Sequence, residues 1–186
     1  MEVKKTLKPN YVYKVIDSPV GKLKLVASQK GLAAVLWEND DPRRVRLSPV
    51  EEDTAHPLLA EAEQQLKEYF SGQRKSFSLR LDPVGTPFQN RVWQALLGIP
   101  FGETRRYGEL AEQLGSASAR RAVGAANGRN PIAIVVPCHR VIGASGELTG
   151  FAGGLEVKKR LLMLEGRTGD ESKRKKPAAS RPAKRA

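Results

Sequence analysis

The chain has 186 residues and a formal net charge of +12, from 32 lysines and arginines against 20 acidic residues. A single cysteine excludes an internal disulfide framework, and the N-terminal segment has no apolar core of the kind that a signal peptide needs. No apolar run is long enough to cross a bilayer, so we expect no membrane partner, and the basic charge favours nucleic acid as the partner instead.

The first part of the chain predicts a small α+β unit in which no residue has an obvious chemical role. Residues 12–37 alternate between apolar and polar side chains around a turn, which predicts a β-hairpin or meander. The polar, proline-containing residues 39–53 predict a loop. Apolar residues at helical spacing then follow Pro57 and stop before Gly72, as in a capped helix. Residues 74–81 alternate again and predict a short strand.

A second unit is expected to begin with a well-marked helix. Thr86 and Gln89 have the spacing of a capping box, and Pro87 occupies the first helical position between them. Apolar residues at helical spacing follow, and Gly98 ends the pattern. These signals place the start of the helix within a residue or so.

Two short helices, over residues 107–114 and 119–127, predict a helix-turn-helix. Gly115 breaks the first helix, and Ser116 or Ser118 can cap the second. The second helix has very small side chains apart from two arginines. This composition allows two interpretations: tight packing against another helix, or insertion into a DNA minor groove with an arginine as the probe.

Cys138 is the only cysteine of the chain, and the residue after it, His139, is one of only two histidines. The apolar residues 134–136 predict a short buried strand that Pro137 stops just before the thiol. A lone cysteine is commonly a small apolar residue of the core. A nucleophilic thiol, by contrast, needs a base that makes the thiolate, and the adjacent imidazole favours this second interpretation.

The C-terminal part predicts one more helix and a tail. Residues 141–151 contain three glycines and predict a hairpin or wing, and apolar spacing predicts the last helix over 155–165. Eight lysines and arginines against two acidic residues follow it without periodicity. We therefore divide the chain into an N-terminal domain (1–82), a second domain (83–166) and a basic disordered tail (167–186) that holds half of the net charge.

The residues around Cys138 resemble the active-site signature of the O6-alkylguanine-DNA alkyltransferase family. The resemblance covers about residues 86–166 and extends more loosely to residues 18–21 and the strand pair after them. It implies an α+β fold with an N-terminal ribonuclease H-like α/β domain and a C-terminal helical, winged-helix-like DNA-binding domain. The matching segments, in chain order, are Pro100-Phe101-Gly102-Glu103-Thr104, Tyr107-Gly108-Glu109-Leu110-Ala111, Arg121-Ala122-Val123-Gly124, Asn130-Pro131, Pro137-Cys138-His139-Arg140-Val141, Gly153-Gly154-Leu155, Leu161-Leu162 and Glu165-Gly166.

The resemblance implies four catalytic residues. Cys138 would accept the alkyl group, and His139 would deprotonate it through a bridging water, with Glu165 orienting the imidazole. Tyr107 would donate a proton toward the departing guanine. Without the resemblance, Glu165 would be interpreted as a solvated carboxylate at a helix end.

The resemblance also implies contacts to the base and to DNA. Asn130 would tie the DNA-reading helices to the active-site strand, and backbone groups of Cys138 and Val141 would read the guanine edge. Because Phe151 and Ala152 stand where some relatives carry tyrosine and serine, a hydrogen bond to O6 must come from backbone N–H groups. The expected substrate-binding residues are thus Asn130, Val141, Phe151 and Ala152, and the expected DNA-binding residues are Tyr107, Gly108, Ser116 and Arg121, of which Arg121 would fill the space of the extruded nucleotide.

The implied function is single-turnover DNA repair, in which an alkyl group leaves O6-alkylguanine, or O4-alkylthymine, and stays on Cys138. Attack at a saturated carbon calls for a soft nucleophile, which a thiolate is. No cofactor and no metal are expected. The partner would be double-stranded DNA bearing O6-alkylguanine, and the protein would act as a monomer in the cytoplasm of a prokaryote or the nucleus of a eukaryote.

Two alternatives from other classes stay open on the sequence alone. A non-catalytic winged-helix DNA-binding protein, in which Cys138 only packs, predicts DNA affinity that Cys138→Ser leaves unchanged. A thiol hydrolase that uses Cys138, His139 and an acid predicts turnover on an ester or amide, and it gives no reason for the basic charge.

Overall fold

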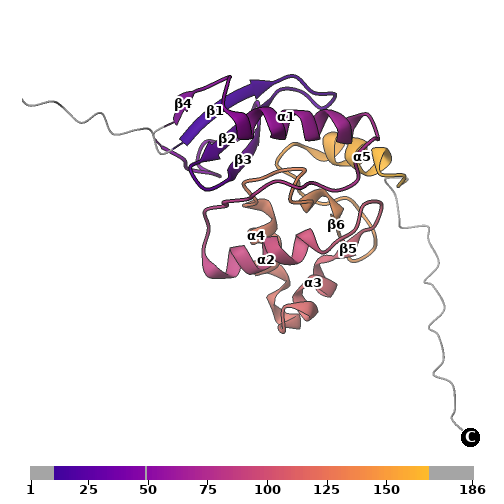
Figure 1. Ribbon diagram of the computed structural model, residues 1–186. Coiled ribbons are helices and arrows are strands. Elements are labelled where there is room, and N and C mark those ends of the chain that lie inside the picture. The colour runs from indigo at the N-terminus through magenta and orange to yellow at the C-terminus, as the bar shows by residue number, and fades with distance from the viewer. Residues whose placement is uncertain (1–10, 49, 168–186) are drawn as a thin grey trace, which may run out of the picture.

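The structure is a computed structural model that describes residues 11–48 and 50–167. The predicted disordered tail lies outside the described residues from position 168 onward. The described chain forms two halves, with a sheet and one helix in the first and a group of helices in the second (Figure 1). Within these residues no helix is long and apolar enough to cross a membrane.

A four-stranded sheet forms the first half. Strands β1 (Tyr11–Ile16), β2 (Leu23–Ser28) and β3 (Leu32–Trp37) make the antiparallel meander that the alternation predicts. A fourth strand, β4 (Val50–Glu52), pairs in parallel with β1, so the strand order is β3-β2-β1-β4. The loop predicted over residues 39–53 therefore ends in a strand, because the outer edge of β1 offers unpaired backbone groups to it.

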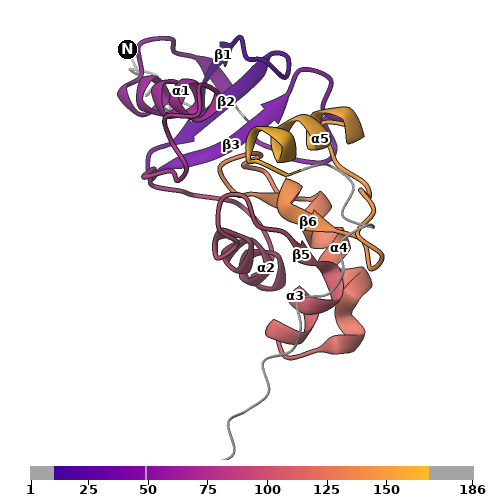
Figure 2. The same cartoon turned by 90° about the vertical axis from the view of Figure 1, so that its right-hand side faces the viewer.

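Helix α1 (Pro57–Phe70) lies across one face of this sheet, as Figures 1 and 2 show from two sides. It begins with proline at its first position, and Gly72, just beyond its end, has a φ of 77°. Both ends agree with the sequence prediction, since only glycine takes this left-handed conformation without strain. Leu59 and Leu66 of the helix are fully buried in the same core as Leu23 and Leu25 of the sheet.

The strand predicted over residues 74–81 is not formed. Its backbone groups bond elsewhere: the Ser78 N–H donates to the Gln65 side chain at 2.9 Å, and the Arg80 carbonyl accepts from Leu32 at 2.8 Å. Only Leu81 bridges to β3, through Leu32. The segment is extended and half-buried, but it does not join a sheet. The alternation of apolar and polar residues therefore predicted its burial correctly and its strand pairing wrongly.

The second half contains the predicted helices. Helix α2 (Pro87–Leu97) has the capping box of Thr86 and Gln89, with both reciprocal hydrogen bonds present. It packs against the helix-turn-helix, and the last helix crosses at the junction of the two halves (Figure 2). The remaining elements are β5 (Arg105–Arg106), α3 (Tyr107–Gln113), a short 3₁₀ turn (Ala117–Ala119), α4 (Arg120–Gly128), a second 3₁₀ turn (Cys138–Arg140), β6 (Val141–Ile142) and α5 (Leu155–Leu164).

Two local predictions in this half were wrong. Neither Ser116 nor Ser118 caps α4. The 3₁₀ turn includes Ser118 and separates Ser116 from the helix, so Ala119 is the residue that precedes α4. The two serine hydroxyls lie 3.2 Å from each other. The hairpin predicted over residues 141–151 is also absent. Its first residues, β6, pair in parallel with β5 instead. The segment then makes a tight turn, in which the Gly146 N–H donates to the Gly143 carbonyl and the Gly143 N–H donates to the Glu147 carbonyl.

Candidate active site

The segment that carries Cys138 is a series of tight turns and not the predicted strand. The Val135 N–H donates to the Ala133 carbonyl at 2.8 Å around Ile134, whose φ is 70°. The Cys138 N–H donates to the Val136 carbonyl at 2.8 Å around Pro137, whose φ of −81° and ψ of 62° are those of an inverse γ-turn. Periodicity cannot separate a short buried strand from buried turns, which explains the error.

Asn130 holds these turns in place. Its side-chain amide donates to the Val136 carbonyl at 2.9 Å, and its side-chain oxygen accepts from the Ile132 N–H at 3.0 Å. A positive φ at a β-branched residue such as Ile134 costs roughly 1–3 kcal/mol, so the surrounding bonds must over-determine it. Asn130 thus links the end of α4 to the turn that carries Cys138.

Cys138 borders a narrow recess of about 10 Å³ and is 6% exposed. Phe151 and Ala152, expected at the substrate, line the same recess. Two residues of the first half close its other side: Trp37, whose ring meets that of Phe151 edge-on with centroids 5.5 Å apart, and Arg44. The thiol is therefore neither walled off from every cavity nor freely exposed, and both halves of the chain shape its surroundings.

His139 lies behind the thiol with no exposed surface, and its Nε2 is 2.8 Å from Oε1 of Glu165. Glu165, just after α5, is buried as well, so it is not a solvated carboxylate at a helix end. The other ring nitrogen of His139, Nδ1, is buried and has no hydrogen-bond partner among the described residues.

Five hydrogen bonds converge on the two oxygens of Glu165. Oε1 accepts from His139, from the Tyr69 hydroxyl at 2.7 Å and from Nη2 of Arg140 at 3.0 Å. Oε2 accepts from Nε of Arg140 at 2.8 Å and from the Gly102 N–H at 3.3 Å. This number of donors is what keeps a carboxylate ionised in the protein interior.

The pKa values of this pair fix the protonation of the imidazole. Burial alone would raise the pKa of Glu165, but the hydrogen bonds from His139 and Arg140 and the positive charge of Arg140 lower it to about 2. Burial lowers the pKa of His139, against the opposing effect of Glu165. The imidazole is therefore neutral at neutral pH, its Nε2 must donate to the carboxylate, and its Nδ1 keeps a lone pair that can take a proton.

Burial raises the pKa of the Cys138 thiol, while the Asn130 amide and the charges of Lys158 and Arg44 act in the opposite direction. Lys158 of α5 is fully buried, and burial lowers its pKa to about 8. Its Nζ donates to the carbonyl oxygens of Val141 at 2.6 Å and Thr149 at 2.9 Å. The resting thiol is thus protonated, and two cations stand near it that favour the thiolate once it forms.

Tyr107 interacts electrostatically with Cys138, and Val141 contacts the Lys158 that stands near the thiol. Tyr107 begins α3, is half-buried and accepts a hydrogen bond from Asn127 of α4 at 3.4 Å. Burial raises the pKa of Tyr107, and the nearby Cys138 acts in the same direction, so the phenol keeps its proton. Val141 is buried, and its carbonyl has a second lone pair beyond the one that binds Lys158.

The remaining expected residues lie apart from the recess, on α3, on α4 and on the link between them. Gly108 is in the first turn of α3, and a Cβ there would come 3.6 Å from the Arg120 side chain. Ser116 and Arg121 are exposed. Gly124 of α4 faces the Tyr107 ring, so one face of this helix packs closely through its small residues, while the exposed Arg121 stays a candidate for contact with DNA.

Comparisons with known proteins agree on one family. Residues 87–167 match the family described as 6-O-methylguanine DNA methyltransferase, DNA binding domain, and residues 11–83 match its ribonuclease-like domain. The chain belongs to the 6-O-methylguanine DNA methyltransferase family. The predicted fold class, with a ribonuclease-like domain before a DNA-binding domain, is thereby confirmed.

Individual relatives match over nearly their whole length. The methylated-DNA–protein-cysteine methyltransferase of Methanosarcina acetivorans is 50% identical over 155 residues, which are 83% of this chain and 97% of the relative. That of Mycobacterium leprae is 53% identical over 152 residues, 81% of this chain and 89% of the relative. The crystal structure of Mycobacterium tuberculosis OGT in complex with DNA is 48% identical, with a TM-score of 0.77, and covers 87% of this chain and 96% of that one.

The methyltransferase site contains residues that sequence reasoning missed. Tyr69, Trp37 and Arg44 all belong to the half for which no chemical role was predicted, and Tyr69 lies among the apolar residues of α1. Lys158 gave a signal, because it stands three residues before Leu161 on the apolar side of α5, where a charge is out of place. Within residues 11–48 and 50–167 no group of three or more His, Cys, Asp or Glu side chains is placed to hold a metal ion.

Glu165→Gln tests the electrostatics of this methyltransferase site. Because the folded-state pKa is about 2 against an ordinary 4.5, the carboxylate stabilises the fold fully above about pH 4.5 and loses this effect as the pH falls toward 2. We expect the variant to lose roughly 3–5 kcal/mol of unfolding free energy at pH 7, because Arg140 is left unpaired. The difference from the parent should shrink steadily between pH 4.5 and the lowest pH at which both still fold.

Urea unfolding at a series of pH values measures this difference. Glu112→Gln, at an exposed position of α3, is the matched control and should follow the parent at every pH. A loss for Glu165→Gln that stays constant from pH 7 into the acid range would contradict the assigned ionisation.

Proposed function

We propose that this protein repairs DNA by moving an alkyl group from O6 of alkylguanine to the sulfur of Cys138, irreversibly and once per molecule. The observation that carries the proposal is the buried His139–Glu165 pair beside the recess that Cys138 borders. O4-alkylthymine is the second candidate substrate. The DNA-binding domain of the family and the relatives named as cysteine methyltransferases support the same conclusion.

In the first step the thiol loses its proton. Nδ1 of His139 takes it, through a bridging water, and the imidazolium that forms is stabilised by the Glu165 carboxylate on the opposite ring nitrogen. The positive charges of Lys158 and Arg44 favour the thiolate over the thiol. A thiol that is protonated at rest and ionised only on demand is protected from unwanted reactions.

In the second step the sulfur attacks the saturated carbon of the alkyl group. The carbon–sulfur bond forms as the carbon–O6 bond breaks, and the electron pair of the broken bond goes to the guanine. Tyr107, which keeps its proton because it is buried, hydrogen-bonds to or protonates the departing base. The thioether that remains on Cys138 has no leaving group, so the protein is consumed.

The base must leave the duplex to reach the recess, at a cost of about a few kcal/mol. Helices α3 and α4 would lie against the minor groove, with Gly108 and Ser116 at the backbone and Arg121 in the space of the extruded nucleotide. Asn130 then couples the DNA-reading helix α4 to the turn that carries the thiol. Phe151 and Ala152 would line the base, with backbone N–H groups as the donors to O6.

The alternatives explain less of the site. A Cys138 that only packs needs no buried imidazole and carboxylate beside it, and burying such a pair is costly without a use. A thiol hydrolase accounts for the pair but not for an exposed arginine on a helix of very small side chains.

The proposal includes the organisation and setting of the protein. It comprises an N-terminal domain (1–82), a catalytic and DNA-binding domain (83–166) and a basic tail (167–186), acting as a monomer on double-stranded DNA that carries O6-alkylguanine. It needs no cofactor and no membrane. It works where the genome is, in the cytoplasm of a prokaryote or the nucleus of a eukaryote.

Duplex DNA containing O6-methylguanine tests the reaction directly. After mixing, peptide mapping by mass should find one methyl group on Cys138, in proportion to the lesion repaired. Cys138→Ala should stay unmodified, because it has no nucleophile, while still binding DNA. An intact lesion beside unmodified Cys138 would reject the proposed function.

Arg121→Ala separates extrusion from chemistry. Because a few kcal/mol of unstacking must be offset, we expect repair of duplex DNA to slow by roughly tenfold or more, while the reaction with free O6-benzylguanine stays unchanged. Single-turnover rates on both substrates measure this. Arg120→Ala, the same change at the neighbouring exposed position, should slow duplex repair much less. Equal slowing on duplex and free base would exclude Arg121 from extrusion.

A further inference from the structure

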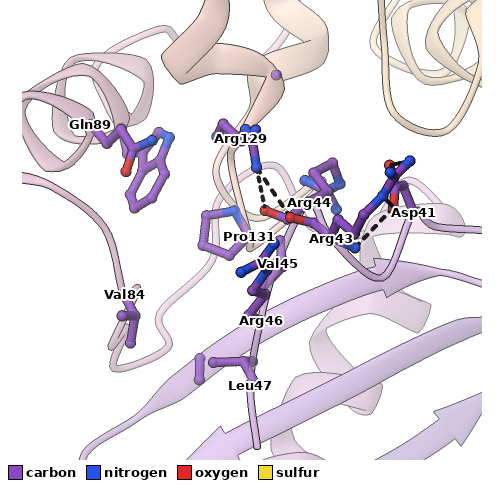
Figure 3. A pocket seen from close by; sticks show the side chains of 13 residues that line it. Asp41, Arg43, Arg44, Val45, Arg46, Leu47, Val84, Gln89, Arg129 and Pro131 are labelled. Atoms are coloured by element: carbon purple, nitrogen blue, oxygen red, sulfur yellow. Dashed lines mark hydrogen bonds and ion pairs between the residues drawn. The ribbon is translucent and has the colours of Figure 1, made fainter.

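A groove of about 790 Å³ runs between the first half and the end of α4, next to the Cys138 recess. Its first wall is the loop that carries Arg43, Arg44 and Arg46, and Arg129 stands on the opposite wall (Figure 3). Arg44 and Gly128 line both the groove and the recess, so the two are adjacent.

The positive charge in this groove is only partly neutralised. Arg44 is paired with Asp40, and Arg43 lies 3.2 Å from Asp41. Arg129 donates from one nitrogen to the carbonyls of Arg43 and Arg44, at 3.2 and 3.4 Å, which fixes its position, and its charge helps to lower the pKa of Asp41, which lines the same groove. Arg46 is exposed and has no ion pair among the described residues. The four arginines thus exceed Asp40 and Asp41 by two positive charges, and Arg46 is the one of them that neither forms an ion pair nor acts on the pKa of Asp41 among the described residues.

The rest of the groove suits a nucleic-acid backbone. Ala33, Val84, Trp93 and Pro131 give it apolar surface, and walls of low dielectric concentrate the field of the arginines. The guanidinium group is the side chain that binds phosphate oxygens in pairs. Arg44 has a part in the alkyl-transfer chemistry, but neither that chemistry nor the helix-turn-helix accounts for Arg43 and Arg46 on the first half of the chain.

The position of the groove relative to α4 indicates the occupant. Arg121 is near the start of this helix and Arg129 follows its end, so they lie about 12 Å apart along the axis. The minor groove that would receive Arg121 is only about 6 Å wide, so a helix of this length reaches past the groove to the phosphodiester backbone that borders it. A duplex that receives Arg121 therefore has backbone on the side of the other end of α4.

We propose that this groove, through Arg46 and Arg129, binds the phosphodiester backbone of duplex DNA and extends the DNA contact onto the N-terminal half. The inference rests on the proposed function for the orientation of the DNA, but not for the binding itself. The loop of residues 41–47 thereby acts as a second contact surface, separate from the helix-turn-helix.

Salt dependence of binding to undamaged duplex DNA tests this groove. Each phosphate contact contributes about 0.9 to the slope of log K against log salt concentration, so the double variant Arg46→Ala, Arg129→Ala should lower the slope by roughly 2. Its reaction with free O6-benzylguanine should match the parent. Fluorescence anisotropy over a range of salt concentrations gives the slope.

Arg160→Ala, paired with Arg80→Ala, removes the same two charges from exposed positions outside the groove and is the matched control. An unchanged slope in the groove variant, or an equal change in the control, would overturn the proposal. So would a groove variant whose only defect is in self-association, measured by sedimentation, because the occupant would then be a second copy. Since the DNA is undamaged, failure of alkyl transfer would not affect this outcome.

A second, independent observation concerns Tyr69. This residue of α1 is fully buried, and its hydroxyl donates to Oε1 of Glu165 at 2.7 Å, the same oxygen that His139 contacts. Its ring packs against Phe70, Phe77 and Phe101. The first half of the chain therefore supplies a hydrogen bond to the carboxylate that orients the base.

We infer that Tyr69 is a positioning residue that tunes His139 through their shared carboxylate oxygen. The charged and titratable groups around Glu165 are His139 and Arg140 from the Cys138 turn and Tyr69 from α1, and Lys158 of α5 acts on His139 by its charge. Burial raises the pKa of Tyr69, so its proton stays on the phenol and the bond keeps one direction. The inference rests on the proposed function.

Tyr69→Phe removes the donor and keeps the ring. With one donor fewer, the Glu165 charge is less shared and stabilises the imidazolium more, so the acid limb of the pH–rate profile should move up by roughly half to one pH unit. The single-turnover reaction with free O6-benzylguanine, which needs no DNA, gives this profile. Tyr13→Phe, on the sheet, should leave the profile unchanged.

A rate that falls equally at every pH would mean a structural role only, and an unchanged profile would mean no role; either result overturns the inference. If the parent itself leaves Cys138 unmodified by O6-benzylguanine, the proposed function fails instead. The two failures are thus distinguishable.

Discussion

One buried carboxylate organises much of this molecule. Glu165 takes donors from α1, from the turn after Cys138, and from the backbone of Gly102, so a single ion joins three parts of the chain that are distant in sequence. An unpaired charge in this position would cost several kcal/mol, and the fold can tolerate it only while all the donors stay in place. The hydrogen bonds that fix the geometry of His139 and Glu165 therefore also hold the two halves of the chain together.

The chain shows which features local sequence can specify. The start of α2 was predictable because a capping box and a proline act over four residues, and the end of α1 was predictable because Gly72 takes a conformation that other residues avoid. The turns before Cys138 were not, because they depend on the Asn130 side chain and on a strained Ile134, and neither leaves a periodic signal.

The candidate site divides in the same way. Cys138 and His139 could be singled out from their rarity and adjacency, whereas Glu165 needed the resemblance to a family, since an acid at a helix end is ordinary. The role of Tyr69 could not be predicted. A tyrosine among the apolar residues of a helix is interpreted as a core residue, and only the structure shows that its hydroxyl contacts a distant part of the chain. Lys158 could have been singled out from the sequence. A lysine on the apolar side of a helix is expected to be buried, and a buried lysine needs hydrogen-bond partners.

The contact between Trp37 and the loop after β6 has a consequence for which lesions can be accommodated. A Cβ at Gly153 would come within 2.7 Å of the Trp37 ring, so the glycine lets the indole press against the loop that holds Phe151. The indole comes from the sheet and the loop from the opposite end of the chain, yet together they bound the slot beside the sulfur. Under the proposed function, the alkyl group must enter beside the indole of Trp37, so a strand that takes no part in the reaction supplies one boundary of the space for the adduct.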